Sequence, residues 1–418
     1  MKESNYNLII RTKNRNKVIY NTLYGSVTLV PKSFSFTNLK KLKPEVKNLL
    51  MLNKHLIPDE INELDLIRSQ NRLQRFNKET LELTILPTLW CNLNCQYCYE
   101  NKRKEEMTTR DIAAICNFVE AKSSNVNTIS ILWFGGEPLL RVDIIETISK
   151  KVSALAKRKK INFKNSIITN GTLLNEKTRD RLAKIGIKYV QITLDGPPEI
   201  HDKRKPFING GATFKLILDN ILKAIDYFDV SIRINVDDEN IHSVRDLVDI
   251  LSSLNLQNKL YIYVAKTENV LGVCESIGGA CLNDIDFLNK EKRILQYLQE
   301  KGFKKIARPS YRPDYCTADN VHSYTIIPNN KIYKCWHLVS DPKEQVGTLS
   351  GSKIVFNHNI YKWLAYDPID DIGCRRCRYL PLCMGGCPKI RLEEKRKRCD
   401  NLKNSITKFI EFLMANTR

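Results

Sequence analysis

The stretch Cys91-Asn92-Leu93-Asn94-Cys95-Gln96-Tyr97-Cys98 carries more information about the fold than any other part of the chain. Three thiolates at this spacing on one loop can bind three corners of a [4Fe–4S] cluster, and the fourth iron is then open to a substrate or cofactor. Zinc loops prefer Cys-x2-Cys pairs, and a structural zinc site is closed by a fourth ligand. The spacing therefore favours an iron–sulfur site over zinc or plain structural cysteines.

The sequence around this motif alternates between strand-like and helix-like segments. Apolar stretches predict strands at Leu81–Leu86, Thr128–Phe134, Ser166–Thr169, Tyr189–Leu194, Ser231–Val236 and Leu260–Val264. Amphipathic stretches predict helices at Thr109–Lys122, Asp143–Lys157, Glu176–Ile185, Thr213–Tyr227 and Ile241–Leu254. Six β/α units in series predict an α/β fold with a parallel sheet that forms a partial (β/α)6 barrel. In such sheets the active site lies at the carboxyl ends of the strands, where the cysteine motif falls.

The two ends of the chain follow different patterns. In residues 1–78, strands are expected at Asn7–Arg11, Lys17–Asn21 and Ser26–Val30, with a polar turn at Thr12–Asn16, and helices at Lys43–Leu56 and Asp59–Arg75. This order indicates a winged-helix-like module. After a bridging helix near Asn289–Lys301, residues 310–399 are turn-rich and contain seven cysteines, so we expect metal sites to hold this segment together. The predicted domains are 1–78, 79–300 and 301–418.

The composition narrows the class of protein. A chain of 418 residues with 42% hydrophobic and 27% charged residues is typical of a soluble protein with more than one domain. No stretch has the 18 apolar residues of a membrane span, and the N-terminus lacks the order of a secretory signal. These features predict a cytoplasmic protein without a membrane partner. In that compartment 13 cysteines indicate metal or redox chemistry rather than disulfides.

The net charge of +21 is compatible with several partners. Residues 1–78 contain fifteen basic and six acidic residues, and the last 31 residues contain nine basic and four acidic ones. Such an excess is typical of proteins that bind nucleic acid. An acidic peptide partner or an ordinary solvated surface would explain it as well.

The spacing Cys-x3-Cys-x2-Cys, with an aromatic residue before the last cysteine, resembles the signature of the radical S-adenosylmethionine (SAM) superfamily. The resemblance implies that SAM chelates the open iron, and that its reductive cleavage gives a 5′-deoxyadenosyl radical that abstracts hydrogen from a substrate. It makes Cys91, Cys95 and Cys98 the catalytic cluster ligands. Other segments match the family at successive strand ends, and the resemblance implies cofactor binding by Tyr97, Gly135, Gly136, Glu137, Pro138, Thr169, Asn170, Asp195, Arg233 and Asn235.

The C-terminal cysteines have a second specific pattern. Cys374-x2-Cys377-x5-Cys383-x3-Cys387 followed by Cys399, with Cys316 and Cys335 upstream, resembles the SPASM domain. The resemblance implies two auxiliary [4Fe–4S] clusters. It assigns Cys374, Cys377, Cys383 and Cys399 to an outer cluster, and Cys316, Cys335 and Cys387 to an inner one nearer the SAM site. The alternative is a pair of zinc knuckles, because Cys-x2-Cys also suits zinc.

Several positions in the second half of the chain depart from the family or lie outside its motifs. Asn330 stands where relatives have glycine, and because asparagine tolerates the left-handed conformation we expect the turn to survive. His322 stands where some relatives have a fourth inner-cluster cysteine. His322 could bind iron, or the iron could be open for a substrate thiolate, or a residue elsewhere could be the fourth ligand. The simplest interpretation of His322 is an ordinary surface histidine. Cys116 is expected in a helix core, and Cys274 and Cys281 as unremarkable thiols.

The resemblance covers nearly the whole chain and is strongest to SPASM enzymes that mature ribosomally made peptides. It implies a precursor peptide bound by its leader along a strand edge of the N-terminal module, an electron donor such as flavodoxin or ferredoxin, and a cross-link from a cysteine sulfur to a carbon. Carbon–carbon cross-linking or epimerisation would use the same motifs. Maturation of a sulfatase is a further alternative, but relatives with that activity usually have aspartate where this chain has Trp336, which counts against it. Nucleic-acid modification would need a basic recognition helix, and Asp59–Arg75 mixes both charges.

Overall fold

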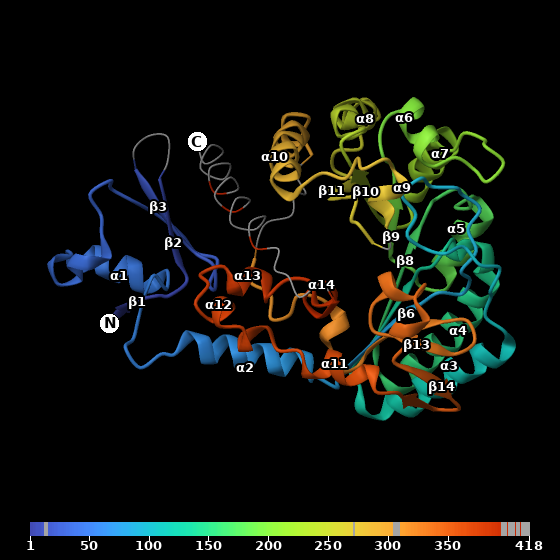
Figure 1. Ribbon diagram of the computed structural model, residues 1–418, viewed down its shortest axis with the longest axis horizontal. Helices are drawn as coiled ribbons and strands as arrows, with labels where there is room; N and C mark the ends of the chain where they lie inside the picture. The colour runs from blue at the N-terminus through green and yellow to red at the C-terminus, as the bar shows by residue number, and fades with distance from the viewer. Residues whose placement is uncertain are drawn as a thin grey trace. The chain divides into compact units, whose positions relative to one another are not determined.

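The computed structural model describes residues 1–11, 16–270, 272–303 and 310–393, together with Cys399, Ile406 and Ile410 (Figure 1). The chain folds as two compact units. Unit 1 comprises residues 1–77, 308–320 and 364–418, and unit 2 comprises residues 78–307 and 321–363. The packing thus divides the predicted third domain between the two units, and the functional roles of the three predicted domains remain predictions. Of the predicted turn at 12–16, residues 12–15 lie outside the described part of the chain.

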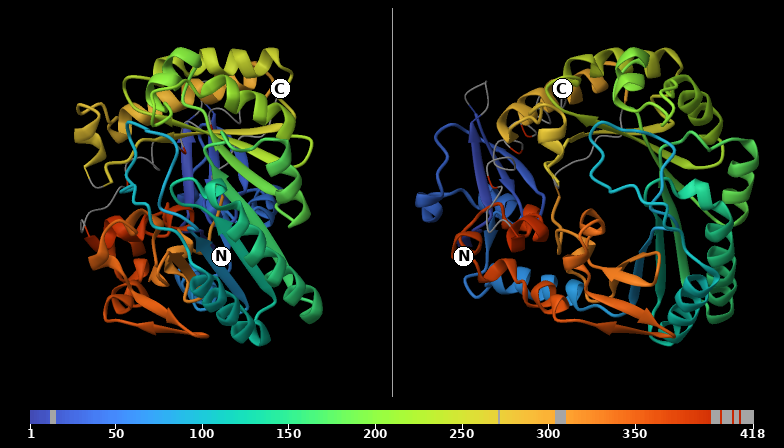
Figure 2. Two further views of the ribbon diagram at one scale, coloured as in Figure 1. Left: turned by 90° about the vertical axis from the view of Figure 1, so that its right-hand side faces the viewer. Right: turned by 45° about the vertical axis from the view of Figure 1, so that its right-hand side comes forward.

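Unit 2, as far as the structure describes it, is built on a ten-stranded sheet in which the six strands of the predicted β/α units are parallel. These strands are β6 (Thr80–Ile85), β7 (Thr128–Trp133), β8 (Asn162–Thr169), β9 (Tyr189–Thr193), β10 (Asp229–Val236) and β11 (Leu260–Lys266), in the spatial order β11-β10-β9-β8-β7-β6. The connecting helices are α3 (Thr109–Lys122), α4 (Val142–Lys159), α5 (Glu176–Lys184), α6 (Pro198–Arg204), α7 (Phe214–Ala224) and α8 (Val244–Ser253). They follow the outer side of the curved sheet (Figure 2). The predicted α/β fold with six β/α units is confirmed.

The burial pattern of β10 explains how the sheet positions polar groups. Val230, Ile232 and Ile234 point to one face and are buried, whereas Arg233 and Asn235 point to the other face and are half-buried. Because successive side chains of a strand point to opposite faces, the apolar set packs beneath the helices and the polar set faces the inner side of the sheet. Two of the predicted cofactor residues therefore lie on the inner face near the carboxyl end.

Four shorter strands extend the sheet beyond β6. β12 (Ser323–Ile327) pairs parallel to β6, and β13 (Lys331–Tyr333), β14 (Gly347–Ser350) and β15 (Lys353–Phe356) continue it as antiparallel strands. The sequence predicted only a turn-rich segment here. Asn330, between β12 and β13, has a φ of +58°, so the expectation that asparagine preserves the left-handed turn is confirmed.

Unit 1 contains a three-stranded antiparallel sheet of β2 (Asn7–Arg11), β3 (Lys17–Asn21) and β4 (Val27–Val30). The helices α1 (Pro44–Leu52) and α2 (Glu63–Arg75) follow, and the short strands β1 (Lys2–Glu3) and β5 (Leu56–Ile57) pair with each other. The strands and helices expected between residues 7 and 75 are present. The strands lie close to their predicted bounds, whereas the predicted helix 43–56 extends beyond the end of α1 and the predicted helix 59–75 begins before α2. The winged-helix interpretation itself remains a prediction.

The C-terminal cysteine-rich segment shares the apolar core of unit 1. One face of the sheet packs against Leu382, Ile406 and Ile410, all buried. The helices α12 (Ile372–Arg375), α13 (Leu380–Cys383) and α14 (Pro388–Glu393) belong to this segment. Ile369, Cys374, Leu380 and Met384 pack in one cluster with Tyr6, Leu23 and Ile67. The sequence predicted that metal sites would hold this segment together; the structure adds an apolar core that the N-terminal residues complete.

Within the described ranges, no helix combines the length and the apolar character that crossing a bilayer would require.

Candidate active site

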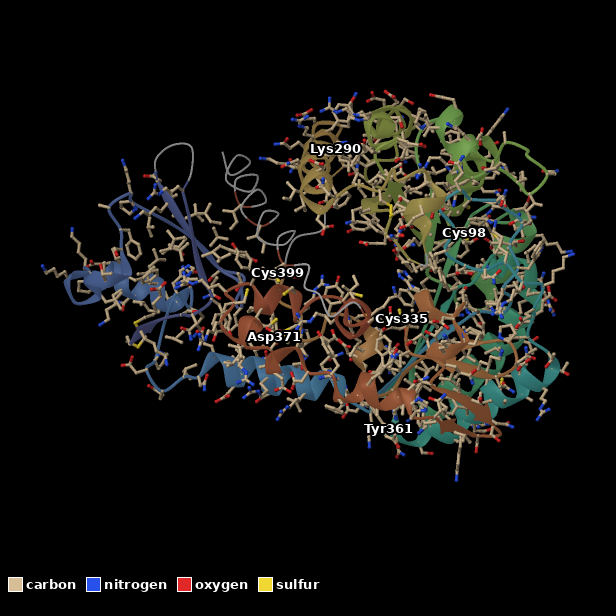
Figure 3. The ribbon with its side chains drawn as sticks, in the orientation of Figure 1. Cys98, Lys290, Cys335, Tyr361, Asp371 and Cys399 are labelled. Atoms are coloured by element: carbon tan, nitrogen blue, oxygen red, sulfur yellow. A yellow bond between two sulfur atoms is a disulfide. The ribbon has the colours of Figure 1, made fainter. Side chains whose placement is uncertain are left out.

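The three cysteines of the motif lie on the loop of residues 86–108 between β6 and α3, at the carboxyl end of the parallel strands. Figure 3 labels Cys98 on this loop. The loop is held by backbone hydrogen bonds to the segment that follows α6: the Asn94 amide donates to the Pro206 carbonyl at 2.8 Å, and the Gln96 amide donates to the Arg204 carbonyl at 3.0 Å. Cys91 is buried, Cys95 is half-buried and Cys98 is exposed.

Hydrogen-bond donors from three segments point at the sulfur atoms. The Leu93 amide lies 3.4 Å from the Cys91 sulfur, and the Asn170 side-chain amide lies 3.8 Å from it. Lys205 Nζ lies 3.4 Å from the Cys95 sulfur. Burial raises the pKa of the Cys91 thiol to about 12, and the nearby Glu137 carboxylate adds to the rise. Three thiols with donors aimed at two of them form a donor set that suits an anionic iron–sulfur cluster.

The described residues contain no group of three Cys, His, Asp or Glu side chains that converge as ligands of a single metal ion. A [4Fe–4S] cluster binds each cysteine at a different iron, so its ligands stand farther apart than those of one ion. The lack of a single-ion site among the described residues is therefore compatible with a cluster held by Cys91, Cys95 and Cys98.

The Gly135-Gly136-Glu137 turn after β7 packs directly on the cysteine loop. A Cβ atom on Gly136 would come within 2.3 Å of the Trp90 carbonyl oxygen, and one on Gly135, whose φ is +119°, within 2.6 Å of the Thr88 carbonyl oxygen. The Glu137 amide donates to the same Trp90 carbonyl at 2.9 Å. Glycine is required here because two backbone segments approach too closely for any side chain. Pro138, which follows, is buried.

The buried Glu137 carboxylate connects the ends of β7 and β8. Its oxygens accept hydrogen bonds from the Thr169 hydroxyl and the Asn170 amide, both at 2.7 Å, and from the Leu139 amide at 2.9 Å. Burial raises the pKa of Glu137 above its ordinary value. Asn170 in turn donates to the Asn92 side chain at 2.8 Å, so this chain of contacts positions the cysteine loop from two strand ends.

Tyr97, Asp195 and Asn235 also come together. The Tyr97 hydroxyl donates to Asp195, and the Asn235 side chain donates to the Tyr97 oxygen at 3.2 Å. Asp195 is fully buried and also accepts the Asn235 backbone amide at 3.0 Å. The Asp195 amide donates to His201 Nδ1 at 3.1 Å, and burial lowers the pKa of His201 to about 3, so that imidazole is neutral. Three predicted cofactor residues thus form one network.

Arg233 lies on the same face of β10 as Asn235, two residues earlier in the strand. Its Nε donates to the Asn235 side chain at 2.7 Å, and its guanidinium carbon lies 5.9 Å from the centre of the Tyr263 ring. The Tyr263 hydroxyl donates to Gln191 at 2.7 Å. The inner face of β9 to β11 is therefore polar and aromatic at this level, which suits a polar ligand rather than an apolar core.

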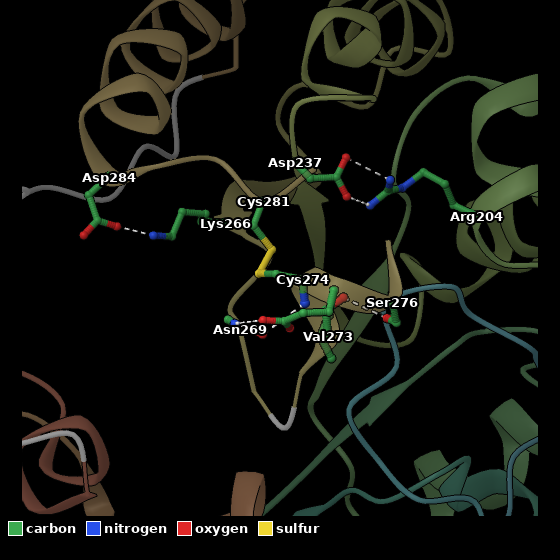
Figure 4. Close-up of a disulfide and its surroundings, with 10 residues drawn as sticks. Arg204, Asp237, Lys266, Asn269, Val273, Cys274, Ser276, Cys281 and Asp284 are labelled. Atoms are coloured by element: carbon green, nitrogen blue, oxygen red, sulfur yellow. Dashed lines mark hydrogen bonds and ion pairs between the residues drawn. A yellow bond between two sulfur atoms is a disulfide. The ribbon is translucent and has the colours of Figure 1, made fainter. Parts of the chain in front are cut away.

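The sequence did not identify two further residues of this region, Asp237 and Lys205. Asp237 forms an ion pair with Arg204, with Nη1 to Oδ1 at 3.0 Å and Nη2 to Oδ2 at 2.7 Å, and the two side chains are 0% and 3% exposed (Figure 4). The Arg204 guanidinium lies 5.0 Å from the centre of the Tyr97 ring. A lysine next to motif cysteines carries no periodicity in the sequence that could have identified it.

The C-terminal cysteines of unit 1 lie close enough to one another to interact electrostatically. Burial raises the pKa of the Cys383 thiol to about 11, and Cys377, Cys374 and Cys399 each add to the rise. These four are the predicted ligands of the outer cluster. Burial likewise raises the pKa of Cys316 to about 11, with a contribution from Cys387.

Cys335 belongs to unit 2 and follows β13. The residues after it contact the cysteine loop: the His337 and Tyr99 rings lie 4.7 Å apart, and the Asn101 amide donates to the Ser340 hydroxyl at 3.0 Å. Trp336 lies 6.0 Å, centre to centre, from Phe134 beside the glycine turn.

His322 is not the surface histidine that the sequence suggested. It is buried, and its Nδ1 donates to the Lys78 carbonyl at 3.1 Å, within unit 2. A carbonyl can only accept, so this contact fixes the tautomer. Cys116 is half-buried rather than fully inside the core.

Cys274 and Cys281 are not free thiols, contrary to the expectation from the sequence: they form a disulfide (Figure 4). The disulfide closes the loop between β11 and α10 (Asp284–Glu300). The loop is tied to the end of β10 by the Asp238 amide, which donates to the Ala280 carbonyl at 2.8 Å. Sequence spacing alone gives no reason to pair two cysteines separated by seven positions, because pairing depends on how the loop folds.

Comparison with known proteins identifies the family of this chain. A sequence profile described as the radical SAM superfamily matches residues 85–251. A probable GTP 3′,8-cyclase of Methanocaldococcus jannaschii is 31% identical over 264 residues, which cover 62% of this chain and 74% of that protein. Two other curated relatives are spanned over only 40% and 58% of their lengths.

Solved structures show the same fold. Native anSMEcpe with bound AdoMet and Cp18Cys peptide aligns with a TM-score of 0.63 and 19% identity over 80% of this chain and 97% of that chain. Streptococcus suis SuiB bound to precursor peptide SuiA aligns with a TM-score of 0.53 and 17% identity over 92% and 95%. The matching family profile and the 31% identical relative show that the chain belongs to the radical SAM superfamily of enzymes, which use a [4Fe–4S] cluster and S-adenosylmethionine.

Proposed function

We propose that this chain is a radical SAM maturase that modifies a ribosomally made peptide, forming a cross-link from a cysteine sulfur to a carbon of the peptide. The observation that carries the proposal is that Cys374, Cys377 and Cys399 lie close enough to Cys383 to raise the pKa of its thiol, because an auxiliary cluster of the SPASM type needs neighbouring thiols. A radical SAM core together with such a domain is the combination that the sequence resembles in peptide maturases.

Cys91, Cys95 and Cys98 are the proposed ligands of the cluster that binds SAM. When bound there, the cluster and SAM supply one-electron cleavage and hydrogen abstraction. The residues of the chain orient these groups. The glycines at 135 and 136 let two backbone segments approach each other, and the Asp195 network fixes Tyr97 on the cysteine loop.

The proposed outer auxiliary cluster has the four ligands around Cys383. The proposed inner cluster has Cys316, Cys335 and Cys387 as ligands. Support for Cys335 is that the residues after it contact the loop of the SAM-binding cysteines. The Nδ1–H of His322 donates to the Lys78 carbonyl, which leaves Nε2 as an acceptor, and this is the tautomer in which a histidine could be the fourth ligand. An open iron on the inner cluster could instead take a sulfur of the substrate.

The proposed leader-binding surface is the edge strand β4 of unit 1. Among the described strands, β4 pairs only with β3, and its Val27 and Leu29 side chains are 38% and 52% exposed. An extended peptide can add to such an edge through main-chain hydrogen bonds, with alternate side chains supplying specificity. The basic balance of residues 1–78 suits an acidic leader.

We also propose an acidic one-electron donor such as flavodoxin or ferredoxin, and a cytoplasmic location. Disulfides are rare in the cytosol, so the Cys274–Cys281 bond is the observation that counts against this location. Alkylation of the protein before and after reduction, on material taken directly from the producing cell, would decide whether the bond exists there.

The first test is mass spectrometry of a short cysteine-containing peptide encoded beside this gene, incubated without oxygen with the reconstituted enzyme, SAM and a reductant. A cross-linking maturase removes two hydrogens per modified cysteine, a loss of about 2 Da, and forms 5′-deoxyadenosine. An unchanged peptide mass with 5′-deoxyadenosine formed would favour epimerisation. No 5′-deoxyadenosine from fully iron-loaded enzyme would overturn the proposal.

Iron content tests the ligand assignment separately from activity. With three clusters the chain should hold about 12 irons, and replacing Cys91, Cys95 and Cys98 together by alanine should leave about 8. Cys116→Ala is the matched control, because that cysteine lies outside every predicted ligand set, and it should leave the iron content unchanged. Equal iron content in the triple variant and the wild type would reject the assignment.

Leader binding has its own test, fluorescence anisotropy with a labelled precursor peptide. Leu29→Asp places a charge on the β4 edge and should weaken binding at least tenfold. Leu52→Asp, at a more exposed leucine at the end of α1 in the same unit, should not. Equal weakening by both variants would show that β4 is not the binding edge.

A further inference from the structure

Lys205 is a buried cation in contact with one of the motif cysteines. Lys205 is only 6% exposed, and its Nζ lies 3.4 Å from the Cys95 sulfur. Among the described residues no carboxylate forms an ion pair with it. The preceding residue, Arg204, is equally buried but has the Asp237 carboxylate as a two-point partner. The charge of Arg204 is therefore compensated by a carboxylate ion pair, whereas the close polar contact of Lys205 is with a cysteine sulfur.

The backbone around Lys205 holds the side chain in this place. The Lys205 amide donates to the His201 carbonyl at 2.8 Å, and the Thr213 hydroxyl donates to the Lys205 carbonyl at 2.8 Å. The next carbonyl, that of Pro206, accepts the Asn94 amide of the cysteine loop. These contacts fix the backbone on both sides of Lys205 beside the cysteine loop.

An ammonium group that is buried without an anionic partner is costly. The negative groups around Lys205 are the Cys95 thiolate beside it and, at longer range, the Asp195 carboxylate and the Cys91 thiolate, with which it interacts electrostatically. The arrangement is therefore suited to a state in which these cysteines are ionised, which is the state in which they bind iron.

We propose that Lys205 raises the reduction potential of the cluster held by Cys91, Cys95 and Cys98, by donating a hydrogen bond to the Cys95 sulfur and placing a positive charge beside the cluster. This inference rests on the proposed function, in that it needs a cluster at these cysteines. A [4Fe–4S] core with three thiolates is negatively charged, and adding one electron increases that charge. A nearby cation in a site of low dielectric constant stabilises the reduced form more than the oxidised form.

In the proposed step one electron passes from an external one-electron reductant to the cluster, and no covalent bond forms or breaks. Lys205 stays protonated throughout. It acts on the cluster through its charge and its hydrogen bond to sulfur, and is therefore a positioning residue rather than a catalytic one.

The test is a redox titration of the reconstituted full-length chain followed by electron paramagnetic resonance, with titanium(III) citrate as reductant. The signal that changes on addition of SAM identifies the cluster concerned. Lys205→Met and Lys205→Gln remove the charge, and Lys205→Arg keeps it. Lys203→Met is the matched control, because Lys203 lies two positions earlier, in α6, and is exposed.

Both neutral variants should lower the ratio of reduced to oxidised cluster at least tenfold at a fixed potential, which for one electron is a midpoint about 59 mV more negative. Lys205→Arg should stay within threefold of the wild type, and Lys203→Met should be unchanged. Wild-type potentials in the loaded neutral variants would overturn the inference and leave the proposed function intact.

Iron analysis decides the remaining outcomes. Failure of both neutral variants to load iron, with normal loading of Lys205→Arg, would support the requirement for a cation beside the cluster. Failure of all three substitutions at this position would show a purely structural role and overturn the inference. A wild-type chain without any SAM-sensitive cluster signal would instead overturn the proposed function, and the inference with it.

Discussion

Asp237→Asn should strongly destabilise unit 2. The substitution keeps the size of the side chain and the Oδ1 acceptor used by the Glu239 amide, but it removes the charge that faces Arg204. Because Arg204 is only 3% exposed, its guanidinium would remain buried without its partner. Removing one member of a buried ion pair costs about 3–5 kcal/mol in the free energy of unfolding.

The structure places the expected value at the low end of this range. Asp195 Oδ2 lies 3.9 Å from Arg204 Nε and can offset part of the lost attraction. We therefore expect a loss of about 3 kcal/mol. The Arg204 contact with the Tyr97 ring should weaken as well, so the variant should also bind less iron after reconstitution.

Tryptophan fluorescence during urea unfolding of the iron-free protein is the appropriate assay. All four tryptophans of the chain lie in unit 2, so their emission reports that unit: Trp90, Trp133, Trp336 and Trp363. Asp238→Asn is the matched control, since the adjacent carboxylate is exposed and pairs with Lys290 at the surface, where such pairs contribute little. It should leave the unfolding midpoint unchanged.

A loss below about 1 kcal/mol in Asp237→Asn would refute the reasoning, because it would mean that the guanidinium finds solvent or another anion when its partner is removed. A further check is Arg204→Met combined with Asp237→Leu. Replacing both charges with apolar groups should recover most of the stability lost in the single variant, since neither charge is then left buried alone.

Three further predictions concern other parts of the chain. Burial lowers the pKa of His55 to about 4, so the unfolded imidazole takes up its proton at a higher pH than the folded one. Unit 1 should therefore be fully stable above pH 6.5 and lose about 2 kcal/mol by pH 5. Hydrogen exchange of residues 44–57, corrected for its intrinsic pH dependence, should show this loss, and His55→Gln should abolish it. Gly136→Ala should cost about 1–3 kcal/mol and reduce iron binding, because its Cβ would meet the Trp90 carbonyl at 2.3 Å, whereas Gly211→Ala, with no contact under 3.4 Å, should change neither the urea midpoint nor the iron content. Cys274→Ser should lower the stability of unit 2 by about 2 kcal/mol without reductant and make its midpoint insensitive to dithiothreitol; a midpoint that still responds to dithiothreitol would point to a different disulfide.

The sequence determined the six β/α units of unit 2 because their signals are local. Each β/α unit carries its own alternation of apolar and polar residues, and parallel strands can be connected only by crossovers of this kind, so α3 begins and ends where the pattern predicts. The spacing of Cys91, Cys95 and Cys98 is also local, since all three lie on one loop. Glu137, Thr169 and Asp195 were predicted at strand ends, and the parallel register brings those ends to one edge.

The strands β12 to β15 and the composition of unit 1 were decided by contacts between distant residues. β12 pairs with β6, more than 230 positions away, and the N-terminal sheet is covered by Leu382 of the cysteine-rich segment. No local pattern indicates such a pairing, because the apolar residues of 364–393 are too few to suggest a core unless the N-terminal residues complete it.

The side chains that complete the site were likewise decided by tertiary structure. Lys205 and Asp237 carry no motif, and whether a lysine is buried against a thiol or exposed to solvent depends on the path of a backbone that the sequence does not specify. The same holds for the Cys274–Cys281 disulfide, which requires its two Cα atoms to lie close together, here 5.4 Å apart. By itself the sequence determined the type of fold, the family and its cysteine motifs, since these depend on spacing along the chain; only the tertiary structure decided which charges are buried together, because electrostatic partners are chosen by distance in space.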